Sequence, residues 1–132
     1  MTANVPSILL VEDNLINQKV ATKLLEKIGY SVVLAENGLK AIEALEKASY
    51  DLILMDIQMP VMNGLEATRI IRKKYEQYGK RGPVIIALTA NTMPEDQSDC
   101  KEAGMDDFIP KPVRQDVLAL TIGRWLSGTT SL

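Results

Sequence analysis

Three acidic residues and one lysine stand where short apolar segments of the sequence end. Glu12 and Asp13 follow the run SILLV, Asp56 follows DLILM, and Lys111 stands between two prolines in FIPKP. A carboxylate at the end of a buried strand is costly unless a partner pairs with it. Three carboxylates that crowd together also repel one another and resist ionisation. If the fold brings these ends together, they form a charged site that needs a cation.

A hard divalent cation would remove this repulsion between the acidic residues. An all-oxygen site with few protein ligands suits Mg²⁺. The predicted direct ligands are Asp13, Asp56 and the backbone carbonyl of Gln58. Glu12 is predicted to act through a bound water.

A threonine and the lysine could complete a site for a phosphoryl group. Thr89 ends the apolar run PVIIALT, and its hydroxyl could act together with Lys111 and a cation. Such a set stabilises an anion with three oxygens, which is what a transferring phosphoryl group presents. Asp56 would then be a carboxylate nucleophile that forms an aspartyl phosphate.

Composition excludes several other classes of function. The 132 residues suit one domain, and a net charge of −2 provides no basic surface for nucleic acid or an anionic membrane. Histidine is absent, which removes histidine general bases, triads and histidine-ligated zinc. Cys100 is the single cysteine, so we expect no intramolecular disulfide and a small apolar filler on a helix. The start MTANVPS has no features of a secretory signal.

Five apolar runs of strand length alternate with five helical patterns. The runs are continuously apolar, which is typical of strands covered on both faces in a parallel sheet. The predicted strands lie at 7–13, 31–37, 51–56, 83–90 and, more weakly, 106–110. The predicted helices begin at Asn14, Asn37, Asn63, Pro94 and Val113. Their predicted ends are Gly29, about Lys47, Gly104 and about Leu126 for the first, second, fourth and fifth helices.

This order of elements predicts an open parallel sheet with helices on both faces. In such a sheet the binding crevice lies beyond the carboxyl ends of the strands. With the strand order 2-1-3-4-5, the first, third, fourth and fifth strands are neighbours, and the acids, Thr89 and Lys111 converge. We expect a domain at 7–126 with flexible ends at 1–6 and 127–132.

Three further features concern packing. The first helix carries one apolar ridge with Ala21 and Leu25 beside it, and the ridge consists of Ile16, Val20, Leu24 and Ile28. The polar loop at 75–83 is expected to be a solvated excursion. Trp125 is expected to anchor the last helix to the sheet.

Taken together, the motifs resemble the receiver domain of two-component response regulators over nearly the whole chain. The matching motifs are LLVEDN with Glu12 and Asp13, DLILMDIQMPVMNG with Asp56, ALTA with Thr89, and FIPKP with Phe108 and Lys111. The stretches EDNLINQKV and MDIQMPVMNGLEATRIIR are most similar to receivers of hybrid sensor histidine kinases.

The resemblance implies a flavodoxin-like (βα)₅ three-layer sandwich and a Mg²⁺-dependent transfer of a phosphoryl group to Asp56. The donor would be the phosphohistidine of a histidine kinase domain or of a histidine phosphotransfer protein. Thr89 and Phe108 would be switch residues that change the face formed by the fourth helix, the fifth strand and the fifth helix. The Lys111–Pro112 peptide bond would be cis. The domain would catalyse its own phosphorylation and dephosphorylation in the cytoplasm, within a parent protein that could be membrane-anchored.

Other interpretations are open to the same class of fold. An aspartate-nucleophile phosphatase carries a second acid two residues after the nucleophile, where this chain has Gln58. A flavin-binding module would need a hydroxyl- and glycine-rich loop where this chain has VEDNLIN. A receiver-like scaffold that is never phosphorylated would not need this set of polar residues. The chain could be a stand-alone receiver or a piece of a larger protein.

Overall fold

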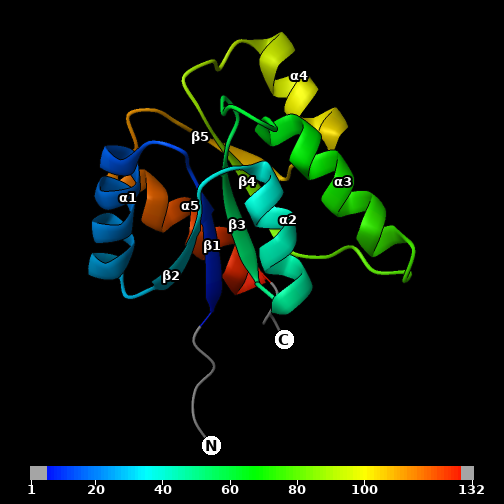
Figure 1. Ribbon diagram of the computed structural model, residues 1–132. Coiled ribbons are helices and arrows are strands. Elements are labelled where there is room, and N and C mark those ends of the chain that lie inside the picture. Colours follow the sequence, from blue (N-terminus) through cyan, green and yellow to red (C-terminus); the bar gives the residue numbers. More distant parts are fainter. Residues whose placement is uncertain (1–5, 129–132) are drawn as a thin grey trace, which may run out of the picture.

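Five strands alternate with five helices in the computed structural model, which describes residues 6–128 (Figure 1). The strands are β1 (Ser7–Val11), β2 (Ser31–Ala35), β3 (Leu52–Asp56), β4 (Val84–Thr89) and β5 (Asp107–Pro110). The helices are α1 (Leu15–Ile28), α2 (Gly38–Lys47), α3 (Gly64–Glu76), α4 (Pro94–Ala103) and α5 (Gln115–Gly128). The last helix begins at Gln115 rather than Val113 and passes the predicted domain end at Leu126. Of the predicted flexible ends at 1–6 and 127–132, residues 127 and 128 belong to α5, while 1–5 and 129–132 lie outside the described residues.

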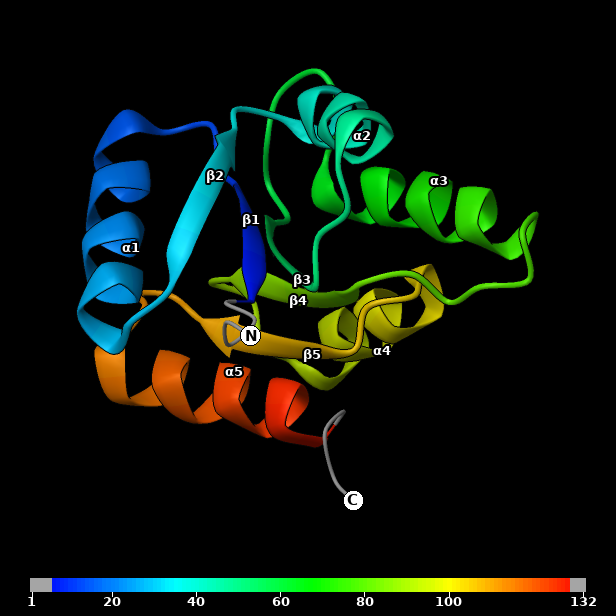
Figure 2. The ribbon, with the colours of Figure 1, turned by 90° about the horizontal axis from the view of Figure 1, so that it is seen from below.

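All five strands pair in parallel in the predicted order, β2-β1-β3-β4-β5. Helices α1 and α5 cover one face of the sheet, and α2, α3 and α4 cover the other (Figure 2). Successive strand residues point to opposite faces, so Leu9 and Ile53 pack in one apolar layer while Leu10 and Leu54 pack in the other. The structure therefore confirms the three-layer sandwich. None of the helices within residues 6–128 combines the length and the hydrophobicity that a membrane-spanning segment needs.

Asparagine caps begin three of the helices directly after the loops that follow the strands. The Asn14 and Asn37 side chains accept hydrogen bonds from Asn17 N at 3.0 Å and Lys40 N at 2.8 Å. Asn63 forms a full capping box with Glu66 at the start of α3. The predicted helix ends at Gly29 and Gly104 are also confirmed, since both adopt the left-handed conformation.

Two predictions of burial are wrong. On α1, Ile16 and Val20 are 71% and 49% exposed, because the buried face of this helix is formed by Gln18, Ala21 and Leu25. Only the second half of the predicted ridge, Leu24 and Ile28, packs against the core. The strand β2 is not covered on both faces either, since it lies at one edge of the sheet and its Val33 and Leu34 side chains are about half exposed.

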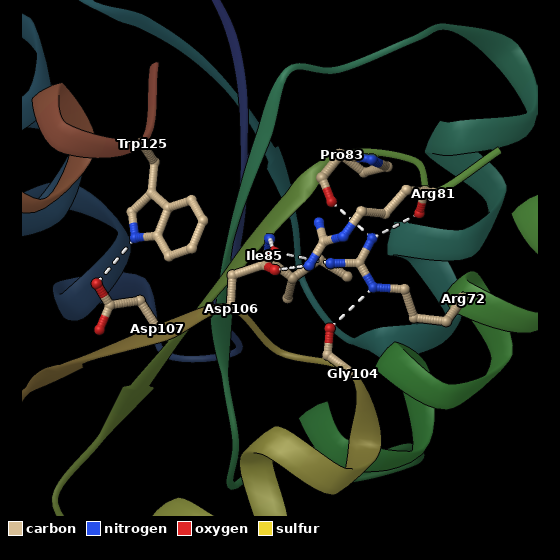
Figure 3. A network of polar contacts seen from close by, with 8 residues as sticks. All are labelled: Arg72, Arg81, Pro83, Ile85, Gly104, Asp106, Asp107 and Trp125. Atoms are coloured by element: carbon tan, nitrogen blue, oxygen red, sulfur yellow. Dashed lines mark hydrogen bonds and ion pairs between the residues drawn. The ribbon is translucent and has the colours of Figure 1, made fainter. Parts of the chain in front are cut away.

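The polar loop after α3 is exposed to solvent at 77–82, as predicted, and two arginines tie it to the rest of the fold (Figure 3). The buried Asp106 carboxylate accepts hydrogen bonds from Arg72 Nη2 and from Ile85 N, each at 2.8 Å, and pairs with Arg81. Arg72 also donates to the carbonyl oxygens of Arg81 and Pro83 in this loop.

The same Arg72 side chain reaches the C-terminal end of α4. Its Nε donates to the Gly104 carbonyl oxygen at 2.8 Å. Burial, and to a lesser degree the charge of Arg81, lower the pKa of Arg72 to about 10. The guanidinium therefore remains charged at neutral pH and ties α3, the loop at 77–83 and the end of α4 to the start of β5.

On the other face, Trp125 attaches α5 to β5 as predicted. Its Nε1 donates to Asp107 Oδ2 at 2.8 Å (Figure 3), and its ring packs against the core layer that α1 and α5 cover. The single cysteine, Cys100, is buried on α4, as expected for an apolar filler.

We expect Arg72→Met to lower the free energy of unfolding by roughly 2–4 kcal/mol, because it leaves the buried Asp106 carboxylate without its main partner. The matched control is Arg81→Met, whose side chain is 61% exposed. This control should cost less than about 1 kcal/mol, because the Arg81 side chain is largely in solvent and Asp106 keeps its bonds to Arg72 and Ile85 N. Urea unfolding of both variants measures the difference, and equal losses would contradict the central role of Arg72.

Candidate functional site

The three predicted acids meet at the carboxyl edge of the sheet. Glu12 and Asp13 come directly after β1, and Asp56 is the last residue of β3. Because β1 and β3 are paired in parallel, their ends lie side by side. One carboxylate oxygen from each of the three residues lies within 4.8 Å of the others. The structure thus brings together the acids that the sequence places far apart.

Two of the three acids are buried. Glu12 and Asp56 are 2% and 3% exposed, whereas Asp13 is exposed. A buried carboxylate loses most of its hydration and needs partners in the protein. The cluster therefore has a buried floor formed by Glu12 and Asp56 and an open side at Asp13.

Lys111 supplies the positive charge of this cluster. Its Nζ lies 2.9 Å from Asp56 Oδ1 and 3.7 Å from Glu12 Oε1. The residue follows β5, and its backbone N donates to Thr89 O at 2.9 Å, which fixes the chain beside β4. The next peptide bond, Lys111–Pro112, is cis, as the resemblance implied.

The electrostatic balance of the cluster leaves excess negative charge. Burial raises the pKa of Glu12, and the nearby Asp56 raises it further, while the Asn14 backbone N–H and Lys111 lower it. One ammonium group cannot neutralise three carboxylates. The all-oxygen donor set and its unbalanced charge therefore fit a hard divalent cation such as Mg²⁺.

The loop after β3 folds back closely onto the strand. Gly64 N donates to Ile57 O at 2.8 Å, and a Cβ atom at Gly64 would lie only 2.4 Å from the Asp56 carbonyl oxygen. Only glycine permits this approach. The loop carries Gln58, which is exposed. Its role as a carbonyl ligand stays a prediction.

The two predicted switch residues lie on the neighbouring strands. Thr89 ends β4 and is 5% exposed, and its Oγ1 accepts a hydrogen bond from Asn91 N at 2.9 Å. Phe108 lies in β5, is half-buried, and packs against the core layer under α2, α3 and α4. Their positions are those expected from the sequence, and their switching role stays a prediction.

Two residues to which the sequence analysis gave no role at the site, Gln18 and Asn14, hold Glu12 in place. The Gln18 side chain donates from Nε2 to Glu12 O at 2.7 Å, and Asn14 N donates to Glu12 Oε2 at 3.1 Å. Gln18 could have been noticed because it stands at helical spacing from Ala21 and Leu25, on the buried face of α1.

Comparison with known proteins identifies close relatives of this chain. The family model described as the response regulator receiver domain matches residues 8–122. The hybrid signal transduction histidine kinase B of Dictyostelium discoideum is 43% identical over 132 residues. This match covers 93% of the present chain but only 7% of that protein, so the chain spans a small part of the relative's length.

Two solved structures of receiver domains are also similar. One is the Saccharomyces cerevisiae histidine phosphotransfer protein Ypd1 in complex with the receiver domain of Ssk1. That receiver has a TM-score of 0.90 and 32% identity, with 98% of this chain and 96% of that chain covered. The other is the receiver domain of a Pseudomonas aeruginosa sensor histidine kinase with a magnesium ion in its active-site cleft. Its TM-score is 0.81 and its identity 39%, with coverage of 94% and 99%.

We expect Glu12→Gln to make the protein more stable at neutral pH in the absence of divalent cations. Because the pKa of Glu12 is raised in the folded state, that state binds the proton more tightly than the unfolded state. Wild-type stability must then fall as pH rises through the raised pKa, and the variant should lack this part of the loss.

The measurement is thermal unfolding from pH 4.5 to 8 in EDTA and in Mg²⁺, with the exposed Glu102→Gln as control. Mg²⁺ at 100 times its Kd should add about 2.7 kcal/mol to the wild type and less to Glu12→Gln. A Glu12→Gln protein that follows the wild-type pH profile would show that the raised pKa of Glu12 has no effect on stability.

Proposed function

The chain belongs to the response regulator receiver domain family, and from this membership we propose that Asp56 is its phosphoryl acceptor. The observation that carries the proposal is the position of this carboxylate. Asp56 ends the central strand β3, with Lys111 Nζ 2.9 Å from its Oδ1 and two further acids around it. This arrangement presents a nucleophile and a cationic partner at one opening of the fold.

Asp13, Asp56 and the Gln58 carbonyl would hold Mg²⁺ directly, with Glu12 acting through a water. When bound, the cation would supply positive charge to the phosphoryl oxygens. The magnesium ion in the related Pseudomonas aeruginosa receiver supports this assignment.

The reaction is an in-line displacement at phosphorus. An Asp56 oxygen forms the new O–P bond, the bond between phosphorus and the donor imidazole nitrogen breaks, and the electron pair stays on that nitrogen. Lys111 and the Thr89 hydroxyl contact the phosphoryl oxygens as negative charge develops on them. The sequence contains no histidine that could act as a base, so catalysis consists of positioning and charge stabilisation.

We expect incubation with acetyl phosphate and Mg²⁺ to add a single phosphoryl group to the wild type and none to Asp56→Asn, because the amide is not a nucleophile for phosphorus. Intact-mass spectrometry, with and without EDTA, measures the adduct. Circular dichroism of Asp56→Asn verifies that the variant is folded. Labelling that survives in this variant would place the acceptor at another residue.

The donor of the phosphoryl group is proposed to be a protein that carries a phosphohistidine. Exposed apolar side chains stand in the elements that follow three strands at this edge: Leu15 and Ile16 on α1, Val61 after β3 and Met93 after β4. Their exposed fractions lie between 60% and 77%, which is unusual for large apolar residues gathered at one edge. A small phosphodonor needs no such surface, whereas a protein donor would bury it. The complex of Ypd1 with a related receiver supports a histidine phosphotransfer protein as this partner, and a histidine kinase domain is the other possible donor.

We expect the double variant Leu15→Ser, Ile16→Ser to slow phosphotransfer from phosphorylated Ypd1 at least tenfold, which corresponds to about 1.4 kcal/mol of lost binding. Labelling by acetyl phosphate should stay unchanged, because no acidic residue is altered. Leu120→Ser, on the exposed side of α5, is the control and should transfer at the wild-type rate. If the double variant is labelled more slowly by the same factor with phosphorylated Ypd1 and with acetyl phosphate, the substitutions have damaged the site itself rather than the docking surface.

The signal is proposed to leave through the face formed by α4, β5 and α5. Phosphorylation adds about −1.5 to −2 charges at pH 7 and strong acceptor oxygens beside Thr89. The Thr89 hydroxyl, which now accepts from Asn91 N, would turn toward the phosphoryl group and release the start of the β4–α4 loop. Phe108 would then rotate into the vacated space, so the change is a shift between two populations of one fold.

The wider setting is proposed from the relatives. Several similar proteins, including the hybrid signal transduction histidine kinases B and K of Dictyostelium discoideum, are hybrid kinases, so this receiver is proposed to be one domain of such a kinase. Because its donor would be the phosphohistidine of a kinase or phosphotransfer protein, we place the domain in the cytoplasm.

A further inference from the structure

We propose that Gln18 is a positioning residue of the acidic site, which acts through the main chain of Glu12. This inference rests on the proposed function of the site. Gln18 lies in the second turn of α1, is 9% exposed, and donates from Nε2 to Glu12 O at 2.7 Å. Among the described residues, its side chain forms no hydrogen bond with Asp56 or Lys111.

The Glu12 main chain is held from both sides. Its N–H donates to Ala35 O at the end of β2 at 3.0 Å, and its carbonyl accepts from Gln18. The Glu12 carbonyl and the Asp13 N–H belong to one planar peptide unit. Fixing this carbonyl therefore fixes the plane from which the Asp13 side chain leaves the backbone.

The choice of glutamine at this position is not explained by helix packing. The neighbours on the buried face of α1 are Ala21 and Leu25, and an apolar side chain would also fit the pattern. A buried amide is costly unless it is hydrogen-bonded, and Glu12 O provides that bond. What glutamine adds over an apolar residue is this link to the loop that carries two of the three acids.

The loop has room to move if this link is lost. An open depression of about 580 Å³ lies beside it, and both Asp13 and Gln18 line its wall. Water could then reach the Glu12 carbonyl, and the Asp13 carboxylate would no longer be held at a fixed distance from Asp56. Loss of an interaction that orients a metal ligand costs about 10- to 100-fold in metal affinity.

The test uses Gln18→Met, which keeps the length of the side chain and removes the donor. We expect the Mg²⁺ Kd, measured by calorimetry on the folded protein, to rise about 10-fold or more. Labelling by acetyl phosphate should slow at low Mg²⁺ and return to within a few-fold of the wild-type rate at saturating Mg²⁺. A purely structural role would lower the melting temperature and leave the Kd unchanged.

The matched control is Gln97→Met. Gln97 lies on α4, and its side-chain amide donates to Thr92 O at 2.8 Å, so the same substitution removes a comparable hydrogen bond. This control should bind Mg²⁺ with the wild-type Kd. A Gln18→Met protein with the wild-type Kd and the wild-type Mg²⁺ dependence of labelling would overturn the proposal. If the wild type itself neither binds Mg²⁺ nor becomes labelled, the proposed function fails instead.

If Gln18→Met does not fold, the wild-type protein still provides a test. The side-chain amide signal of Gln18 in ¹⁵N-labelled protein should shift on titration with Mg²⁺, with the same Kd as the Asp13 backbone amide. The Gln97 side-chain signal should stay in place. A Gln18 signal that does not respond to saturating Mg²⁺ would also overturn the proposal.

Discussion

The repulsion among three carboxylates at one edge of the sheet is the constraint on which this structure depends. Glu12 and Asp56 are buried next to each other, and Lys111 provides one compensating charge at 2.9 Å from Asp56. A cluster of this kind costs folding free energy, because burial and like charge both oppose ionisation. The apolar strands below it supply the stability that offsets this cost. In the proposed function, the same excess charge would attract a cation and, with that cation, a phosphoryl group.

The sequence predicted most of this site because its signals are local. Each acid stands at the end of an apolar run, asparagine stands at three helix starts, and parallel strands place their ends at one edge. The burial of individual side chains was harder to predict. The spacing of Ile16 and Val20 is compatible with a buried face of α1. Which face of α1 is buried depends, however, on where β2 and α5 lie. Likewise, β2 reads as a covered strand, although its place at the edge leaves Val33 half exposed.

The other features that the sequence did not predict are polar contacts between residues far apart in the chain or with the main chain. Arg72 and Asp106 are 34 residues apart, and Arg81 and Asp106 are 25 apart, so no local pattern links them. The prediction of a solvated loop is right about its exposure, but the sequence does not reveal the arginine contacts that hold it. Gln18 escaped notice for a related reason: a glutamine on a helix is usually exposed, and its partner is a main-chain carbonyl that has no sequence signature.

The two sides of the site are not held equally firmly. The side with fewer contacts is where the structure can move. On one side, Gln18, Ala35 and the Asn14 backbone hold Glu12 with three hydrogen bonds. On the other side, α4 buries only Cys100 and Ala103 among the described residues, and its N-cap is Met93, an apolar residue that makes no side-chain cap hydrogen bond. Arg72 fixes the opposite end of α4 through the Gly104 carbonyl. Elements with few buried contacts open first, so new charge at Asp56 should move the start of α4 about its fixed end while the β1 side stays in place.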